Sequence, residues 1–155
     1  MKLPKIKLAN TESLIIRACR ADFTSRNGFQ WKKKGIVTAP DWNPRATCGN
    51  GLHGWLKGEG ESDVWDHNET DVWMVLAVKT KDIVDLGGKV KFPSCRVLYA
   101  GTRDIATALA IAHCPGAKVI YGTATAGNYG TATAGDEGTA TAGNYGTATA
   151  GNYGT

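Results

Sequence analysis

A histidine and a cysteine lie among glycines in the run CGNGLHGW, residues 48–55. Glycine has no side chain, so a backbone or a ligand can approach His53 closely. Histidine titrates near neutral pH and can act as a general base or as a hydrogen-bond donor to a substrate. The sequence also offers polar partners for such a site. The candidate catalytic residues are Arg17, His53, Glu59 and Glu61.

Two other interpretations of this run stay open. Cys48 and His53 are weak candidates for metal binding, with His113 and Cys114 as further ligands. Four residues separate Cys48 from His53, which is no standard zinc spacing, and the sequence has no second CxxC or HxxxH pair. His53 can instead be structural, hydrogen-bonded inside a glycine-rich turn. We expect no metal and no cofactor.

The chain has two compositions. All 18 Lys and Arg, all five Trp and all four Cys lie in residues 1–118, whereas residues 119–155 are almost entirely Gly, Ala, Thr, Asn and Tyr. We therefore expect a head domain, residues 1–118, followed by a repeat domain, residues 119–155. A head of this length can bury a hydrophobic core.

The charge pattern favours a solvated surface over a nucleic-acid interface. The basic stretches are Lys2, Lys5 and Lys7, and Lys32–Lys34. No RNA-binding or helix-turn-helix motif accompanies them, so a nucleic-acid partner is not expected. Residues 1–20 lack the apolar core of a secretory signal, and no apolar run reaches the ~18 residues of a membrane span. Four unevenly spaced cysteines fit a reducing cytoplasm.

Apolar and β-branched runs in the head predict strands. The run VWMVLAV, residues 72–78, is apolar at every position, which predicts a central strand buried on both faces. The other predicted strands cover residues 14–19, 96–100 and 118–121. The last of them leads directly into the repeat.

A hairpin and one helix complete the predicted α+β head, which is mostly sheet. Residues 82–86 and 89–92 flank Gly87-Gly88, a turn signal. Thr102 is the predicted N-cap of a helix that ends near His113. Its predicted apolar face consists of Ile105, Ala108, Leu109 and Ala112.

The residues after the head repeat an eight-residue unit of the form GTATAGNY. Threonine and alanine alternate, so in a strand they face opposite sides. Gly-Asn-Tyr-Gly, and Gly-Asp-Glu-Gly at residues 135–138, are predicted turns in which Gly and Asn adopt positive φ. The candidate binding threonines are Thr123, Thr125, Thr131, Thr133, Thr139, Thr141, Thr147 and Thr149.

Eight residues are too few to close a coil, so two units predict a β-solenoid with coils of about 16 residues that stack about 4.8 Å apart. Alanine would fill a thin interior. This period places Tyr129 and Tyr145 on one edge, with Tyr121, Glu137 and Tyr153 on the other. The Asp-Glu substitution therefore interrupts one tyrosine ladder and leaves the other intact.

The head resembles an uncharacterised bacteriophage and prophage family. The resemblance covers residues 14–120 and rests on the segments IIRACRADFTSRNGFQW, APDW, CGNGLHGWLKGEG, DLGGKVKF and VLYAG. Its most specific part is the Cys-Gly-x-Gly-Leu-His run, which draws attention to His53. The resemblance implies a phage-encoded protein in the cytoplasm of a bacterial host.

A looser analogy connects the head with ADP-ribosyltransferases. Some of these enzymes have an arginine on an early strand and a Gly-His pair near the nicotinamide pocket. The analogy implies such roles for Arg17 and His53, with Glu59 or Glu61 as the acidic partner.

The repeat resembles the sixteen-residue repeats of bacterial ice-nucleation proteins, through its Thr-x-Thr, Ala-Gly and Tyr spacing over residues 121–155. That resemblance implies a β-solenoid with threonine arrays and a tyrosine ladder. The head would cap the first coil, as solenoids require.

These patterns favour a non-enzymatic binding or assembly module. The repeat would present threonine arrays or self-associate through its last coil or its tyrosine edge, because open strand edges pair with other chains. The alternative is an enzyme or host-directed effector with a site at Arg17, Cys48 and His53, which would bind a host protein or a small ligand. Ice binding by the Thr-x-Thr arrays is a further alternative.

Overall fold

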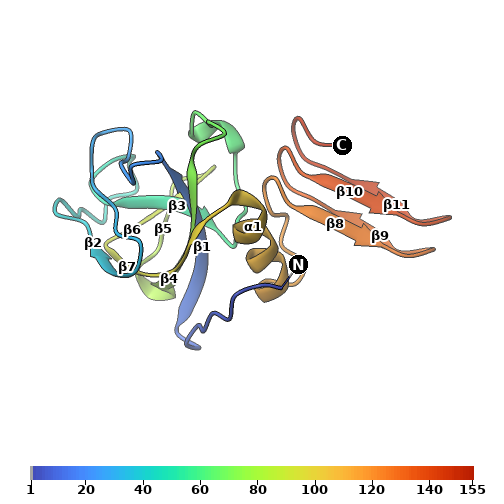
Figure 1. Cartoon of the computed structure of the whole chain (residues 1–155), viewed down its shortest axis with the longest axis horizontal. Helices are drawn as coiled ribbons and strands as arrows, with labels where there is room; N and C mark the ends of the chain where they lie inside the picture. The colour runs from blue at the N-terminus through green and yellow to red at the C-terminus, as the bar shows by residue number, and fades with distance from the viewer. Residues whose placement is uncertain (1) are drawn as a thin grey trace.

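The computed structural model describes residues 2–155 and shows a β-rich head with a repeat that projects from one side (Figure 1). The head strands are β1 (Glu12–Cys19), β2 (Gly35–Thr38), β3 (Leu52–Leu56), β4 (Val72–Lys79), β5 (Val84–Asp85), β6 (Val90–Phe92) and β7 (Ser94–Gly101). The helix is α1 (Arg103–His113), and short 3-10 turns cover Ser62–Val64 and Thr80–Asp82. The repeat strands are β8 (Thr123–Ala126), β9 (Thr131–Thr133), β10 (Thr139–Ala142) and β11 (Thr147–Thr149).

The head strands form one seven-stranded sheet in the order β2-β7-β4-β1-β3-β6-β5. Every pairing in it is antiparallel. β1 and β4 pair from Glu12↔Lys79 to Cys19↔Val72, so they form the centre of the sheet. The prediction of a mostly sheet head with one helix is confirmed, as are the central strand and the hairpin, which β5 and β6 form.

Each face of the sheet carries its own core because strand side chains alternate. On one face Leu14 and Ile16 pack with Leu109 of α1. On the other face Ile15 and Cys19 pack with strands and loops instead of a helix. The alternation places the side chain of residue 17, an arginine, on this second face.

α1 begins where the sequence predicts, because the Thr102 hydroxyl accepts a hydrogen bond from the Ile105 amide at 3.5 Å. Its predicted apolar face is wrong in part, since Ala112 is exposed. The buried residues are Ala106, Thr107, Leu109 and Ala110. Small alanines at this face let the helix approach the sheet closely.

The predicted strand at residues 118–121 is wrong. This segment is irregular because its backbone bonds to a head loop rather than to a neighbouring head strand. The Lys118 amide donates to Glu59 Oε2 at 2.9 Å, and the Ile120 amide donates to the Gly58 carbonyl at 2.9 Å. The segment therefore fastens the start of the repeat to the head.

The repeat strands form two parallel pairs, β8 with β10 and β9 with β11. Thr123 pairs with Thr139, and Thr131 pairs with Thr147, so partners are sixteen residues apart. The predicted sixteen-residue period is confirmed by this register. Threonine therefore lies beside threonine, and alanine beside alanine, in both pairs.

Candidate functional sites

Seven of the eight candidate threonines of the repeat are exposed, and Thr133 of β9 is half-buried. In β8 Thr123 and Thr125 are exposed, while Ala124 and Ala126 are half-buried between the strands. Ala132 and Ala134 are only 3% and 4% exposed. Alanines are therefore the more buried residues of β8, β9 and β10, whereas Ala148 of β11 is exposed. Paired threonines repeat about 4.8 Å apart across strands and about 7 Å apart along them.

The turns of the repeat differ from the prediction. Positive φ falls on the residue after Asn or Asp, with values of 61° at Tyr129, 53° at Glu137 and 59° at Tyr145. Hydrogen bonds to the paired unit hold this costly conformation. For example, the Tyr129 amide donates to the Asn144 carbonyl at 2.9 Å. The Asn128 side chain in turn accepts from the Asn144 amide at 2.8 Å.

Tyrosines form an exposed edge of the repeat. Tyr129 and Tyr145 are 78% and 85% exposed. Their rings stack with centroids 5.3 Å apart and planes at 10°. Tyr153, on the opposite edge, is 86% exposed. Each ring has an apolar body that a partner can cover, so the tyrosine edges are candidate contact surfaces.

The Asp136-Glu137 departure from the repeat joins the repeat to the head. Asp136 Oδ1 accepts from the Asn152 amide at 2.9 Å, as the asparagine does in the other ladder. Its Oδ2 accepts from the Ser62 amide at 3.4 Å, and Glu137 Oε1 accepts from the Ser62 hydroxyl at 3.0 Å. Burial first, and then a hydrogen bond with Glu137, raise the pKa of Tyr121.

A second candidate site is a cleft of about 470 Å³ in the head. It is bounded by β1, β3, the loop at residues 25–31 and the glycine-rich loop at residues 48–51. The residues that line it include Arg17, Phe29, Trp31, His53, Trp65 and Lys89. The structure therefore brings Arg17 of β1 together with Cys48 and His53, which lie about 30 residues later in the sequence.

Arg17 is the buried cation of this cleft, at 8% exposed. Its guanidinium lies 4.3 Å from the centre of the Trp31 ring. It donates to the His53 carbonyl at 3.0 Å, to the Ser25 hydroxyl at 3.3 Å and to the Ala18 carbonyl at 3.2 Å. All three acceptors are neutral, and burial lowers the pKa of Arg17 to about 10.

His53 is held as a neutral ring. Its Nε2 accepts from the Gly49 amide at 3.2 Å, which assigns the proton to Nδ1. Burial, followed by the nearby charges of Lys89, Arg17 and Lys91, lowers its pKa to about 4. A base of this pKa is weak at neutral pH, so the ring acts best as a hydrogen-bond donor.

The carboxylates proposed to serve His53 lie elsewhere. Glu59 accepts from the Lys118 amide at the junction with the repeat. Glu61 packs against Gly88, and neither glutamate lines the cleft. The arrangement that the ADP-ribosyltransferase analogy implies is therefore not assembled.

Cys48 and His53 both line the cleft, but no metal-binding group forms around them. Within residues 2–155 no three His, Cys, Asp or Glu side chains are close enough to hold a metal ion. The Cys48 sulfur instead lies 3.2 Å from Lys89 Nζ.

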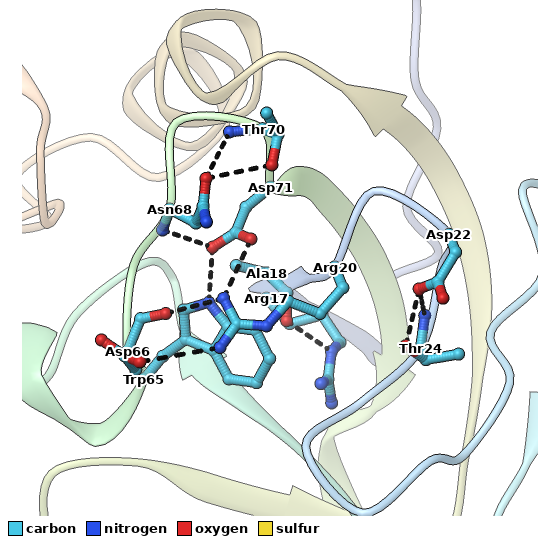
Figure 2. Close-up of polar contacts among 10 residues, drawn as sticks. All are labelled: Arg17, Ala18, Arg20, Asp22, Thr24, Trp65, Asp66, Asn68, Thr70 and Asp71. Atoms are coloured by element: carbon cyan, nitrogen blue, oxygen red, sulfur yellow. Dashed lines mark hydrogen bonds and ion pairs between the residues drawn. The ribbon is translucent and has the colours of Figure 1, made fainter.

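A polar network positions Trp65 at the wall of the cleft (Figure 2). Asp71, 8% exposed, accepts from Trp65 Nε1 at 2.8 Å and from the Asn68 amide at 2.9 Å. Arg20 lies 4.6 Å from the Trp65 ring and pairs with Asp71 at 3.3 Å. Figure 2 also shows the Arg17 side chain pointing away from this carboxylate.

Sequence reasoning missed Trp65, Lys89 and Lys91 as parts of this region. Lys91 is 0% exposed and pairs with His53 across β6 and β3. Its Nζ donates to the Gly49 carbonyl at 3.3 Å. A lysine between Val90 and Phe92 in a predicted strand is the signal that could have found it.

Together these features define a β-rich head that carries a cleft and a parallel-stranded repeat. The chain belongs to the family described as domain of unknown function DUF7666, whose model matches residues 13–108. This range holds every residue that lines the cleft and excludes the repeat. No solved structure matches the chain. Phage origin stays a prediction.

The chain is also similar to bacterial ice nucleation proteins. It is 35% identical to one from Pseudomonas fluorescens over 95 residues, which cover 60% of this chain and 8% of that protein. It is 29% identical to ice nucleation protein InaU of Pantoea ananas over 129 residues, 74% of this chain and 12% of the relative. The chain thus spans about a tenth of these relatives.

These matches involve the head as well as the repeat. The repeat occupies residues 122–155 only, so a match over 74% of the chain must extend well into the head. The predicted resemblance to ice nucleation repeats is confirmed as a similarity. Within residues 2–155, no helix has the length and apolar character that crossing a membrane requires.

Proposed function

We propose that the repeat is a short β-solenoid, capped by the head, whose threonine rows bind ice. The observation that carries this proposal is the pairing of Thr123 with Thr139 and of Thr131 with Thr147. In-register pairing turns isolated hydroxyl and methyl groups into a regular, rigid array facing water. The similarity to ice nucleation proteins supports ice as the ligand.

Lysine substitutions on one row test this proposal. Thr131 and Thr147 are exposed partners in β9 and β11, so Thr131→Lys with Thr147→Lys keeps the backbone but breaks the array. We expect the double variant to lose any effect of the parent on ice recrystallisation or on droplet freezing temperature. The matched control, Ala46→Lys with Thr47→Lys, adds the same charge to exposed head residues and should behave as the parent.

Amide exchange over the repeat must be the same in all three proteins, so that a loss reports on the surface and not on unfolding. A parent protein without any effect on ice growth or freezing contradicts ice binding. An effect that survives both lysines in β9 and β11 contradicts the assignment to the threonine rows.

A second candidate function, self-association, is favoured by the tyrosine edges. Tyr129, Tyr145 and Tyr153 are the large side chains that the repeat leaves mostly in water. Each ring offers an apolar face that a second copy can cover. Replacing all three with serine should reduce the mass measured by sedimentation equilibrium from oligomer to monomer. A parent protein that is monomeric at high concentration overturns this function.

An enzymatic or effector role remains the alternative, and it would use Arg17 and His53. It is the weaker proposal because Glu59 and Glu61 lie outside the cleft. The cytoplasmic location, the phage source and a host partner are predictions of the sequence alone.

A further inference from the structure

We propose that the head cleft is a binding site for a small ligand that joins a flat ring to an oxyanion, either a carboxylate or a phosphate. Neither the family description nor the similarity to ice nucleation proteins assigns a site to the head. The proposal does not depend on what the repeat binds. It rests on the charge of the cleft, on the unused N–H donors of Arg17 and on the aromatic lining.

The charge of the cleft is positive. Arg17, Arg26 and Lys89 line it, against one carboxylate, that of Asp41. His53 adds no charge, because its ring is held neutral by the hydrogen bond from the Gly49 amide. The buried Lys91 lies directly behind, bonded to the carbonyl of Gly49, which is itself a lining residue. An anion entering this cleft meets a surplus of cations in a partly desolvated place, where attraction is strong.

Arg17 has capacity left for such an anion. A guanidinium carries five N–H donors, and Arg17 uses three of them on neutral acceptors. Arg20, three residues later, shows the contrasting case, since it pairs with the carboxylates of Asp71 and Asp66. Among residues 2–155, no carboxylate pairs with Arg17. Burial of a cation without a counter-ion is costly, so an oxyanion there would offset that cost.

The lining explains why the anion should carry a ring. Phe29, Trp31, Trp55 and Trp65 all contribute to the cleft. Trp31 is fixed from one side by the Arg17 guanidinium and by a 2.8 Å hydrogen bond from its Nε1 to Ser25. Trp65 is fixed by Asp71. Rigid aromatic walls and a volume of about 470 Å³ suit a small planar ligand.

Titration of the intact chain with matched probes tests the site. The probes are benzoate and adenosine monophosphate, their neutral counterparts benzamide and adenosine, and inorganic phosphate alone. Because Trp31 and Trp65 line the cleft, intrinsic fluorescence reports binding. We expect one ring-bearing anion to bind at least about tenfold more tightly than its neutral counterpart, as one charge-assisted hydrogen bond implies. Benzoate would identify a carboxylate ligand and adenosine monophosphate a phosphate.

Two variants and one control assign the binding to the cleft. Arg17→Gln should abolish it, and Lys89→Gln should weaken it about tenfold. Lys89 lies in a turn and is half-buried, so its variant decides the question if Arg17→Gln does not fold. Lys34→Gln removes an equal charge from an exposed loop outside the cleft and should bind as the parent does.

The proposal is overturned if no ring-bearing anion binds, if neutral counterparts or free phosphate bind as tightly, or if Lys89→Gln leaves the affinity unchanged. The double variant Thr131→Lys with Thr147→Lys should bind these probes normally. A failure of ice binding and a failure of this site are therefore distinguishable in the same set of proteins.

Discussion

The head and the repeat are both built from strands, but different forces hold them together. The head buries large side chains on both faces of its sheet, among them Ile15, Ile16, Leu76 and Phe92, all at 0% exposure. The repeat, residues 122–155, buries only two side chains among its described residues, Ala132 and Ala134. Its other contacts include backbone hydrogen bonds, the asparagine and tyrosine ladders, and the hydrogen bonds of Asp136 and Glu137 with Ser62.

Because it buries so little, the repeat depends on the head for its order. Burial of apolar area stabilises by about 25 cal/mol per Å², and an alanine offers little area against the entropy of ordering its backbone. The repeat gains its large buried side chains from the junction, where Val119 and Ile120 belong to the head core. The Gly135 amide then donates to the Val119 carbonyl at 3.1 Å. The head thus supplies the apolar burial that the repeat itself lacks.

The largest expected effect comes from the junction core. Ile120 is 0% exposed and packs in the cluster that includes Leu109. Ile120→Ala should lower the free energy of unfolding by about 2–5 kcal/mol, through lost burial and a cavity. Amide exchange should then rise over the whole repeat as well as near α1. Ile36→Ala, at a residue 55% exposed, is the control and should change stability by less than about 0.5 kcal/mol. Equal losses in the two variants contradict the capping argument.

The second prediction concerns Gly135, where the repeat contacts residues 118–120 of the junction. A Cβ at Gly135 would collide with the Lys118 carbonyl and with the Ile120 amide, whereas a Cβ at Gly127 meets nothing within 4 Å. Gly135→Ala should therefore weaken docking of the repeat on the head by about 1–3 kcal/mol. Limited proteolysis should cut the repeat and leave the head intact. Gly127→Ala is at the same place in the repeat unit and should resist proteolysis as the parent does.

Sequence reasoning worked best where a single periodicity decides the structure. The apolar side chains of residues 72–78 point to both faces of a strand, so both faces must be buried. β4 is indeed an interior strand. The sixteen-residue register followed from unit length alone. The N-cap at Thr102 could be predicted because it depends on a hydrogen bond between residues three positions apart.

It failed where a tertiary contact overrides local preference. Residues 118–121 have strand-forming side chains, but their amides bond to Gly58 and Glu59 of a distant loop. Positive φ falls on tyrosine and not on asparagine, because the ladder to the paired unit needs the asparagine side chain elsewhere. In the cleft, the sequence pattern indicated Arg17 and His53, but the aromatic walls come from three separate segments, and only Trp55 belongs to the run that contains His53.

The stability of the head should depend on pH through His53, which lies in the cleft. The pKa of His53 falls from 6.5 to about 4 on folding. Between these values the unfolded chain binds a proton that the folded chain does not, so the free energy of unfolding decreases as pH falls from 6.5 towards 4. His53→Gln keeps an acceptor for Gly49 but removes this dependence. Its melting temperature should fall less between pH 7 and 4.5 than that of the parent. Identical pH slopes would show that His53 is not held neutral.

The smallest expected effect concerns Asp136, which serves both regions through different oxygens. Oδ1 accepts from the Asn152 amide inside the repeat, and Oδ2 accepts from the Ser62 amide of the head. Asp136→Asn keeps the Oδ1 acceptor, so exchange within the repeat should stay unchanged. Asp136→Ala removes both acceptors and should cost about 1 kcal/mol, seen as faster exchange at Asn152 and Ser62 together. If Asp136→Ala speeds amide exchange at Ser62 alone, the hydrogen bonds within the repeat do not need this side chain. The repeat would then depend on the head through Val119 and Ile120.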